Sequence, residues 1–99
     1  MTSWAASTAM TSAAGVAFTN PPATEGPTTG RSLIVVTPDA QRTMNTYLGA
    51  AVQLGPDDLD HEMIARAKVL YMEGYLWDAA PAKQAFIEAA KTAHKAGGK

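Results

Sequence analysis

The chain has 99 residues, of which 46% are hydrophobic and 17% charged, and its formal net charge is -1. This length fits one small domain or a part of a larger one, and the charge excludes the basic surface that binds nucleic-acid phosphates. No apolar stretch approaches the roughly 20 residues of a bilayer span. Cysteine is absent, which excludes disulfides, thiolate zinc sites and thiol nucleophiles. We therefore expect neither a nucleic-acid partner nor a membrane partner.

Residues 1–30 form a segment rich in Ala, Thr and Pro. An Ala-rich helix is expected over residues 2–14, with Gly15 closing it, followed by a short strand over residues 16–18. The first 18 residues contain no Lys or Arg, so they lack the positive region of a secretory signal. A cytoplasmic location is therefore expected.

Residues 31–49 are predicted to form a β-hairpin. The runs SLIVVT (32–37) and RTMNTYL (42–48) are rich in β-branched residues, and Pro-Asp-Ala-Gln between them is typical of a turn. Side chains alternate between the two faces along a strand. Ile34 and Leu33 therefore lie on different faces of the hairpin, and Thr46 lies on a different face from Asn45 and Tyr47. Neither face is fully polar, so the hairpin is expected to cover another part of the structure with one face and to contact protein or ligand with the other.

Residues 50–99 are predicted to form an α-β-α part of a core α/β domain. Gly55-Pro56 and the acids after it favour a helix that ends near Lys68. The continuous apolar run over residues 69–72 is typical of a parallel strand that is covered on both faces. A second helix is expected to begin at Pro81 with Asp78 near its cap, and to bury one side-chain stripe. This stripe comprises Ala82, Ala85, Phe86, Ala89 and Ala93.

A strand that is covered on both faces needs neighbours in its sheet, and a crossover helix normally leads to the next parallel strand. Lys99 lies where we expect that next strand to begin. The sequence therefore predicts a segment of a larger protein, or a protein that needs a partner chain.

The motif search identifies no catalytic residues and no metal site. His61 has no second His at the spacing of a metalloprotease helix, and the acids at positions 57, 58 and 60 lack the spacing of a calcium loop. No phosphate-binding glycine loop is present. A metal role for His61 and its neighbouring acids is left open as a minor alternative, and calorimetry with zinc or calcium tests it.

Glu73 is the strongest single candidate for a binding residue. It ends the apolar run and is followed by Gly74-Tyr75. Ligands bind at the carboxyl ends of strands in open α/β sheets, where a carboxylate can accept hydrogen bonds from hydroxyl groups. An acid that simply reaches solvent is the alternative interpretation.

The run TGRSLIVVTPDAQRTMNTYLGA, followed by LGPDDLDHEMIARAKVLYMEGYLWDAAP, resembles the middle of a carbohydrate and nucleoside kinase of the ribokinase (PfkB) family. The resemblance covers residues 15–99 and is nearest the bacterial adenosine-kinase-like and sugar-kinase members. It implies a partial ribokinase-like α/β fold, in which residues 31–48 are strands of a β-lid that closes over the sugar. The remaining residues would be one edge of the doubly wound core.

The resemblance also implies the site residues and the chemistry. Matching along the lid strands puts Ile34 and Thr46 at substrate-contacting positions, with Asn45 and Tyr47 as further candidates, and Glu73 matches a sugar-contacting glutamate. The full-length family transfers the γ-phosphoryl group of ATP, with Mg²⁺, to a sugar or nucleoside hydroxyl. The family's N-terminal substrate-binding strand and its D-T-x-G-A-G-D segment, which holds the catalytic base, have no counterpart in the sequence.

We therefore expect a kinase segment that is inactive as an isolated chain and binds neither ATP nor Mg²⁺ tightly. Self-association into a homodimer through the lid hairpin is a further expectation. The alternative function is a non-catalytic α/β interaction module whose exposed strand edge pairs with another chain.

Overall fold

The computed structural model describes residues 13–99, and the helix expected over residues 2–14 falls almost entirely outside them. The chain divides into two compact units, one up to Ala50 and one from Ala51 to Lys99. Each unit is described by itself. No helix among the described residues is long and apolar enough to cross a membrane.

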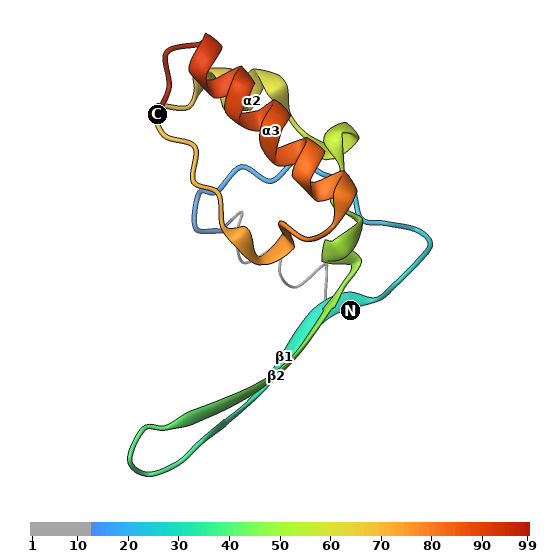
Figure 1. The fold of residues 1–99 in the computed structure, drawn as a ribbon, viewed down its shortest axis with the longest axis vertical. Helices are drawn as coiled ribbons and strands as arrows, with labels where there is room; N and C mark the ends of the chain where they lie inside the picture. Colours follow the sequence, from blue (N-terminus) through green and yellow to red (C-terminus); the bar gives the residue numbers. More distant parts are fainter. Residues whose placement is uncertain (1–12) are drawn as a thin grey trace. The chain divides into compact units, whose positions relative to one another are not determined.

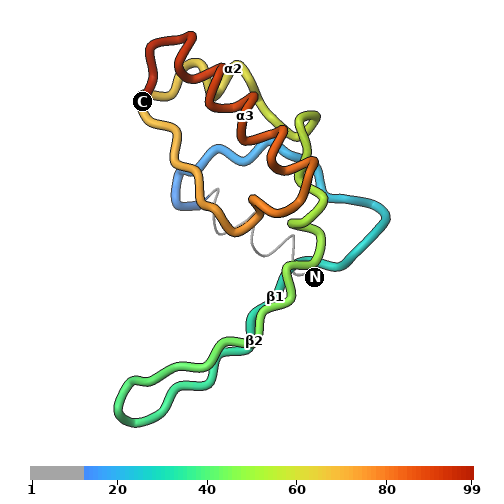
Figure 2. Tube along the Cα trace, viewed as in Figure 1, coloured from blue at the N-terminus to red at the C-terminus, as the bar shows by residue number. Residues whose placement is uncertain are grey.

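The first unit contains a two-stranded antiparallel sheet, β1 (Thr29–Val36) and β2 (Arg42–Gly49), whose strands run side by side in Figures 1 and 2. This confirms the predicted hairpin, with both strands slightly longer than expected. The strand expected over residues 16–18 is wrong: those residues form no strand, because neither β1 nor β2 pairs with them.

The hairpin turn is built from local hydrogen bonds. The Ala40 amide donates to the Thr37 carbonyl and the Thr37 amide donates to the Gln41 carbonyl, each at 2.9 Å. Ala40 adopts a left-handed conformation with φ of 65°, as the last residue of a three-residue hairpin loop does when the loop begins with a type I turn. The Thr37 hydroxyl donates to the Asp39 carboxylate, and this hydrogen bond lowers the pKa of that carboxyl group.

From Ala50 onward the chain forms short helical segments and not one long helix. The segments are η1 (Ala50–Gln53), η2 (Pro56–Asp58) and α2 (His61–Arg66). The expected single helix is wrong because two aspartates each cap a separate start. Asp58 Oδ2 accepts from the Gly55 amide at 2.8 Å, and Asp60 Oδ1 accepts from the Met63 amide at 2.8 Å.

The helix α3 (Ala80–Lys95) packs against α2 and η2 and carries the core of this unit. Among the described residues, the buried apolar side chains are the alanines of one α3 stripe: Ala82, Ala85, Ala89 and Ala93. Phe86 is only partly buried. Its ring packs edge-to-face against the Trp77 ring, with 5.9 Å between the ring centroids. The N-cap of α3 is Ala79, so Asp78 lies directly before the cap, as expected, but no side chain caps the helix.

A hydrogen-bonded pair connects α2 to α3. His61 Nδ1 lies 2.8 Å from Thr92 Oγ1, and that hydroxyl donates to the Glu88 carbonyl at 2.9 Å. Because a hydroxyl has one proton to donate, the His61 ring must donate to it. No group of three or more His, Cys, Asp or Glu side chains suited to a metal occurs in residues 13–99.

Residues 69–72 are extended but form no strand, so the predicted strand is wrong as a member of a sheet. Its backbone contacts are confined to one end. The Lys99 amide donates to the Lys68 carbonyl at 3.2 Å, and the Leu70 amide donates to the Lys99 carbonyl at 2.8 Å. The expected cover on both faces is also not found in the described residues, because Val69 is 68% exposed and Tyr71 80%.

Candidate substrate-binding site

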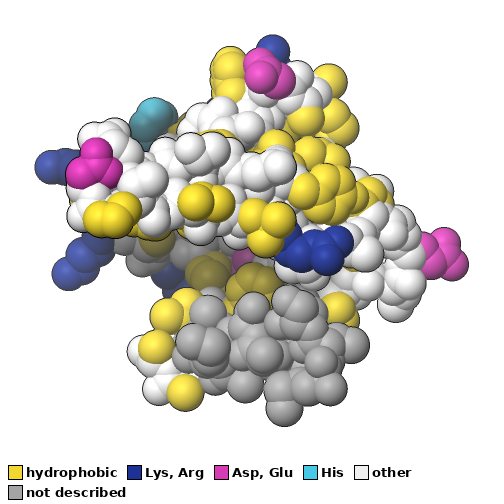
Figure 3. All heavy atoms as spheres, turned by 90° about the horizontal axis from the view of Figure 1, so that it is seen from below, with side chains coloured by type: hydrophobic (Ala, Val, Ile, Leu, Met, Phe, Trp, Pro, Cys, Tyr) yellow, Lys and Arg dark blue, Asp and Glu magenta, His cyan; other side chains and the backbone are white. Residues whose placement is uncertain are grey.

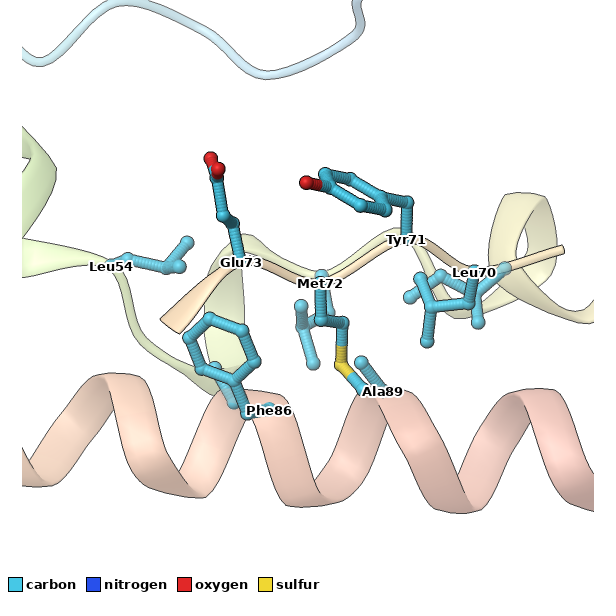
Figure 4. Close-up of a pocket in the computed structure, with 10 residues that line it drawn as sticks. Leu54, Leu70, Tyr71, Met72, Glu73, Phe86 and Ala89 are labelled. Atoms are coloured by element: carbon cyan, nitrogen blue, oxygen red, sulfur yellow. The ribbon is translucent and has the colours of Figure 1, made fainter. Parts of the chain in front are cut away.

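Glu73 stands where the extended segment ends. It precedes the short helix η3 (Gly74–Leu76), and its own backbone is extended, with φ of -114° and ψ of 134°. Figure 4 shows Glu73 and Tyr71 projecting to the side away from α3, whereas Met72 projects toward the helix. The period-2 alternation of a strand therefore persists without a sheet, and it leaves the Glu73 carboxylate exposed.

A cavity of about 220 Å³ lies between the segment and α3. Its lining is almost entirely apolar, and Figure 4 shows its residues as sticks. The lining residues are Leu54, Leu59, Ile64, Leu70, Tyr71, Met72, Glu73, Ala85, Phe86 and Ala89. Since Glu73 is its one ionisable carboxylate and points away from the helix, the cavity beneath is a packing space and not a polar binding pocket.

The register of the hairpin decides which candidate residues share a face. Ile34 pairs with Met44, and Ser32 pairs with Thr46. Cross-strand partners project to the same face of a sheet, and alternation adds residues two positions away, so Ile34 and Thr46 lie on one face. On that face Ser32 Oγ and Thr46 Oγ1 are hydrogen-bonded at 2.9 Å.

Asn45 lies on the other face, because it pairs with Leu33, next to the pair of Arg31 and Tyr47. These four side chains line a shallow hollow of about 250 Å³. A molecule bound to one face of the hairpin can therefore contact Ile34 and Thr46 together. Contact with Asn45 requires a molecule on the opposite face.

Both faces of the hairpin are open. Leu33 is 72% exposed and Ile34 is 53% exposed, and Figure 3 shows hydrophobic side chains, in yellow, at the surface of the chain as it is seen from below. Such a large exposed apolar area is typical of a binding surface.

Sequence reasoning missed Met44 on the face of Ile34, and Arg31 and Leu33 on the face of Asn45. Alternation within each strand groups the residues of that strand correctly. It does not say which group of one strand joins which group of the other. Only the register supplies this, and the turn geometry sets the register.

The chain is similar to known proteins over almost its whole length. The model of the "pfkB family carbohydrate kinase" matches residues 7–99, so the match begins before residue 15, where the sequence resemblance was expected to start. No curated protein matches the chain at a comparable level.

Two solved structures are similar to the chain over 93% of its length. One is a probable sugar kinase from Rhizobium etli CFN 42, with 48% identity and a TM-score of 0.86. The other is an adenosine kinase from Sinorhizobium meliloti, with 50% identity and a TM-score of 0.87. The chain spans 28% of the length of each of these kinases, and its arrangement matches that part of their fold. The chain therefore belongs to the pfkB family of carbohydrate kinases.

Proposed function

We propose that this chain supplies the lid hairpin and one α/β edge of a kinase that transfers the γ-phosphoryl group of ATP, with Mg²⁺, to a hydroxyl of a sugar or nucleoside. The observation that carries the proposal is the match of residues 7–99 to the pfkB family, together with about 50% identity to a sugar kinase and an adenosine kinase. Because ATP is the donor, we place the reaction in the cytoplasm.

Glu73 is assigned the binding of substrate hydroxyl groups. Its carboxylate is exposed and lies at the carboxyl end of an extended segment, which is where ligands bind in open α/β sheets. A hydrogen bond between a hydroxyl and a carboxylate contributes about 1.5–3 kcal/mol. Such a hydrogen bond would orient the substrate. We do not assign Glu73 the role of the base that removes the proton of the acceptor hydroxyl.

The hairpin face that carries Ile34 and Thr46 is assigned to the substrate side of the lid. Ile34 and Met44 offer apolar area for a sugar or nucleobase ring. The hydroxyl groups of Ser32 and Thr46 are hydrogen-bonded to one another, and the hydroxyl that accepts in this pair keeps a proton that it can donate to a substrate oxygen.

Phosphoryl transfer also needs a base for the acceptor hydroxyl and stabilisation of the charge on the transferred group. We assign these tasks to parts of the kinase fold outside the 28% that the chain matches. The 99 residues by themselves are accordingly expected to show no ATP-dependent phosphorylation of ribose, fructose or adenosine.

A chimera tests the proposal. Residues 7–99 replace the matching segment of the Rhizobium etli sugar kinase, and transfer of phosphate from ATP is measured with ribose, fructose and adenosine as acceptors. We expect activity with at least one of them. A chimera that has the circular dichroism of a folded kinase and binds Mg²⁺-ATP, yet phosphorylates no acceptor, would contradict the proposal.

Matched variants in the chimera separate the assigned residues from neutral ones. Glu73→Gln is expected to lower kcat/KM for the acceptor by about 10- to 100-fold, as the loss of about 1.5–3 kcal/mol implies. Glu62→Gln, which changes an exposed glutamate of α2, is the control. Ile34→Ala is expected to raise the KM for the acceptor, whereas Asn45→Ala on the opposite face is not. Equal effects within either pair would refute the assignment.

We further propose that the opposite face of the hairpin, with Leu33 and Val35, contacts a second copy of the chain. These side chains are 72% and 66% exposed, and burial of such apolar area favours association. Sedimentation should show a concentration-dependent dimer that Leu33→Lys abolishes. A wild-type monomer over a wide concentration range would refute this contact.

The interaction-module alternative rests on a single observation: residues 71–73 have no backbone hydrogen bond to another strand within residues 13–99. The family match favours the kinase over the module. An inactive but folded chimera, together with a tight protein complex of the 99-residue chain, would reverse this preference.

A further inference from the structure

The side chains of Ser32 and Thr46 form a hydroxyl pair within an otherwise apolar strip of the hairpin. The two residues are cross-strand partners, and their hydroxyl oxygens lie 2.9 Å apart. Toward the turn, the next pair on this face is Ile34 with Met44, whose side chains are 53% and 49% exposed. Toward the base of the hairpin, alternation puts the half-buried Leu48 on the same face. Between these apolar side chains, the hydroxyl pair is the one polar position of the strip.

The hydroxyl pair has a proton that its own hydrogen bond does not use. Two hydroxyl groups carry two protons, and the bond between the two oxygens takes one of them. Both residues are exposed, so the hydroxyl that accepts within the pair can donate its own proton to a ligand. Hydrogen bonds in a chain polarise one another, and a hydroxyl that already accepts a hydrogen bond is therefore the stronger donor of the two.

The spacing along the strands relates this donor to a ring bound on the apolar part of the strip. Positions two residues apart on a strand are separated by about 6.8 Å, so a ring that lies over Ile34 and Met44 reaches the hydroxyl pair with an atom on its edge. An oxygen of a sugar or a ring nitrogen of a base can accept the proton there. A C–H group at the same place cannot accept it.

We propose that the hydroxyl pair of Ser32 and Thr46 is a specificity determinant, which donates one hydrogen bond to a lone-pair atom on the edge of the substrate ring that Ile34 and Met44 cover. This inference rests on the kinase function proposed above and on the assignment of this hairpin face to the substrate. It adds Ser32 to the candidate site and gives the two hydroxyl groups a joint role. Substrates that present a lone-pair atom at that edge are preferred over analogues that have C–H in its place.

Variants of the chimera described above test the role of the hydroxyl pair. The double variant Ser32→Ala with Thr46→Val removes both hydroxyl groups and keeps the β-branched shape at position 46. It is expected to lower kcat/KM for the substrate by about 3- to 10-fold, mainly through KM, as the loss of one neutral hydrogen bond implies. Thr43→Val is the matched control, because Thr43 pairs with Val35 on the opposite face, and it should leave kcat/KM unchanged. Unchanged amide exchange at Ile34 shows that the hairpin remains folded.

Substrate analogues identify the atom that accepts the hydrogen bond. Adenosine is compared with forms in which one ring nitrogen at a time is replaced by C–H, and an accepted sugar is compared with its deoxy forms. With the unchanged chimera, one analogue should lose about 3- to 10-fold in kcat/KM. The double variant should weaken that analogue no further, although it weakens the others. A nitrogen-replaced form that behaves in this way assigns the hydrogen bond to the base, and a deoxy form assigns it to the sugar.

The outcomes separate this inference from the function on which it rests. An active chimera whose kcat/KM is unchanged or raised in the double variant overturns the inference and leaves the kinase function standing. The same holds if Thr43→Val causes an equal loss. Equal further loss with every analogue also overturns the inference, because the hydroxyl pair then acts on no single atom. A folded chimera that phosphorylates no acceptor overturns the proposed function and this inference together.

Discussion

The close packing along α3 predicts that one substitution has opposite effects at two positions. Ala89 and Ala93 lie one helical turn apart on the buried stripe and are 5% and 2% exposed. Ala89 lines the cavity of about 220 Å³, whereas Ala93 does not. We expect Ala93→Leu to destabilise the second unit and Ala89→Leu to leave it unchanged or more stable.

The surroundings of each alanine give the magnitudes. Ala93 is covered by the backbone that follows α3: the Gly98 amide donates to its carbonyl at 2.9 Å, and a Cβ at Gly98 would lie 3.7 Å from the Ala93 Cβ. Overpacking such a site costs about 1–3 kcal/mol. Ala89 faces Met72, whose flexible side chain is 43% exposed and can move aside. Three added carbons contribute about 0.8 kcal/mol each when fully buried, so a gain of about 1 kcal/mol is expected in a partly open cavity.

Thermal unfolding followed at 222 nm measures the difference. The change in helix propensity is the same at both positions and cancels. The cost of about 1–3 kcal/mol at one position and the gain of about 1 kcal/mol at the other give a difference of about 2–4 kcal/mol. Its lower end corresponds to a Tm difference of about 8–16 °C for a chain of this size, with Ala93→Leu below the wild type. Ala65→Leu, at an exposed position of α2, is the control. Equal destabilisation at both buried positions would refute the role assigned to the cavity.

Three local predictions concern caps and turns. Ala40→Gly should stabilise the hairpin by about 1 kcal/mol, because glycine adopts the left-handed conformation without steric cost; slower exchange of the β2 amides checks this. Asp60→Ala should destabilise α2 by about 1 kcal/mol through loss of the Met63 cap, seen as a lower urea midpoint. Asp39 has a lowered pKa, so its contribution is present above the ordinary value of 3.8 and is lost as the pH falls through the lowered value. Asp39→Asn should remove this acid sensitivity of the turn, and an unchanged pH profile of the Thr37 chemical shift would contradict it.

The hairpin could be predicted from the sequence because its determinants are local. Two β-branched runs and a Pro-Asp turn lie within 21 residues, and the turn itself brings the strands together. The extended run after Val69 has equally strong strand character. A strand, however, is defined by hydrogen bonds to distant residues, and among residues 13–99 only Lys99 supplies them.

The predicted helix boundaries are wrong for a different reason. The acids before His61 are typical of the first turns of one helix. Each aspartate side chain can instead compete for a backbone amide, and Asp58 and Asp60 do so at two separate starts. Aspartates occur both in the first turn of a helix and as caps at its start. Their presence alone therefore does not distinguish one long helix from two short segments.

The side-chain alternation from Leu70 to Glu73 connects the fold to the candidate site. The carboxylate faces away from α3 because it is three residues after Leu70, which packs toward the helix. A one-residue shift of the segment would move Glu73 over the apolar cavity, where an ionised carboxylate is costly. The apolar lining thus fixes which way the acid points, and the two backbone hydrogen bonds that join Lys99 to Lys68 and Leu70 hold the beginning of the segment in place. A side chain at Gly98 would meet the Ala67 carbonyl oxygen at 3.1 Å, so Gly98→Val should displace Lys99 and release the segment. In the chimera this variant should therefore raise the KM for the acceptor, although Gly98 is distant from Glu73 in sequence.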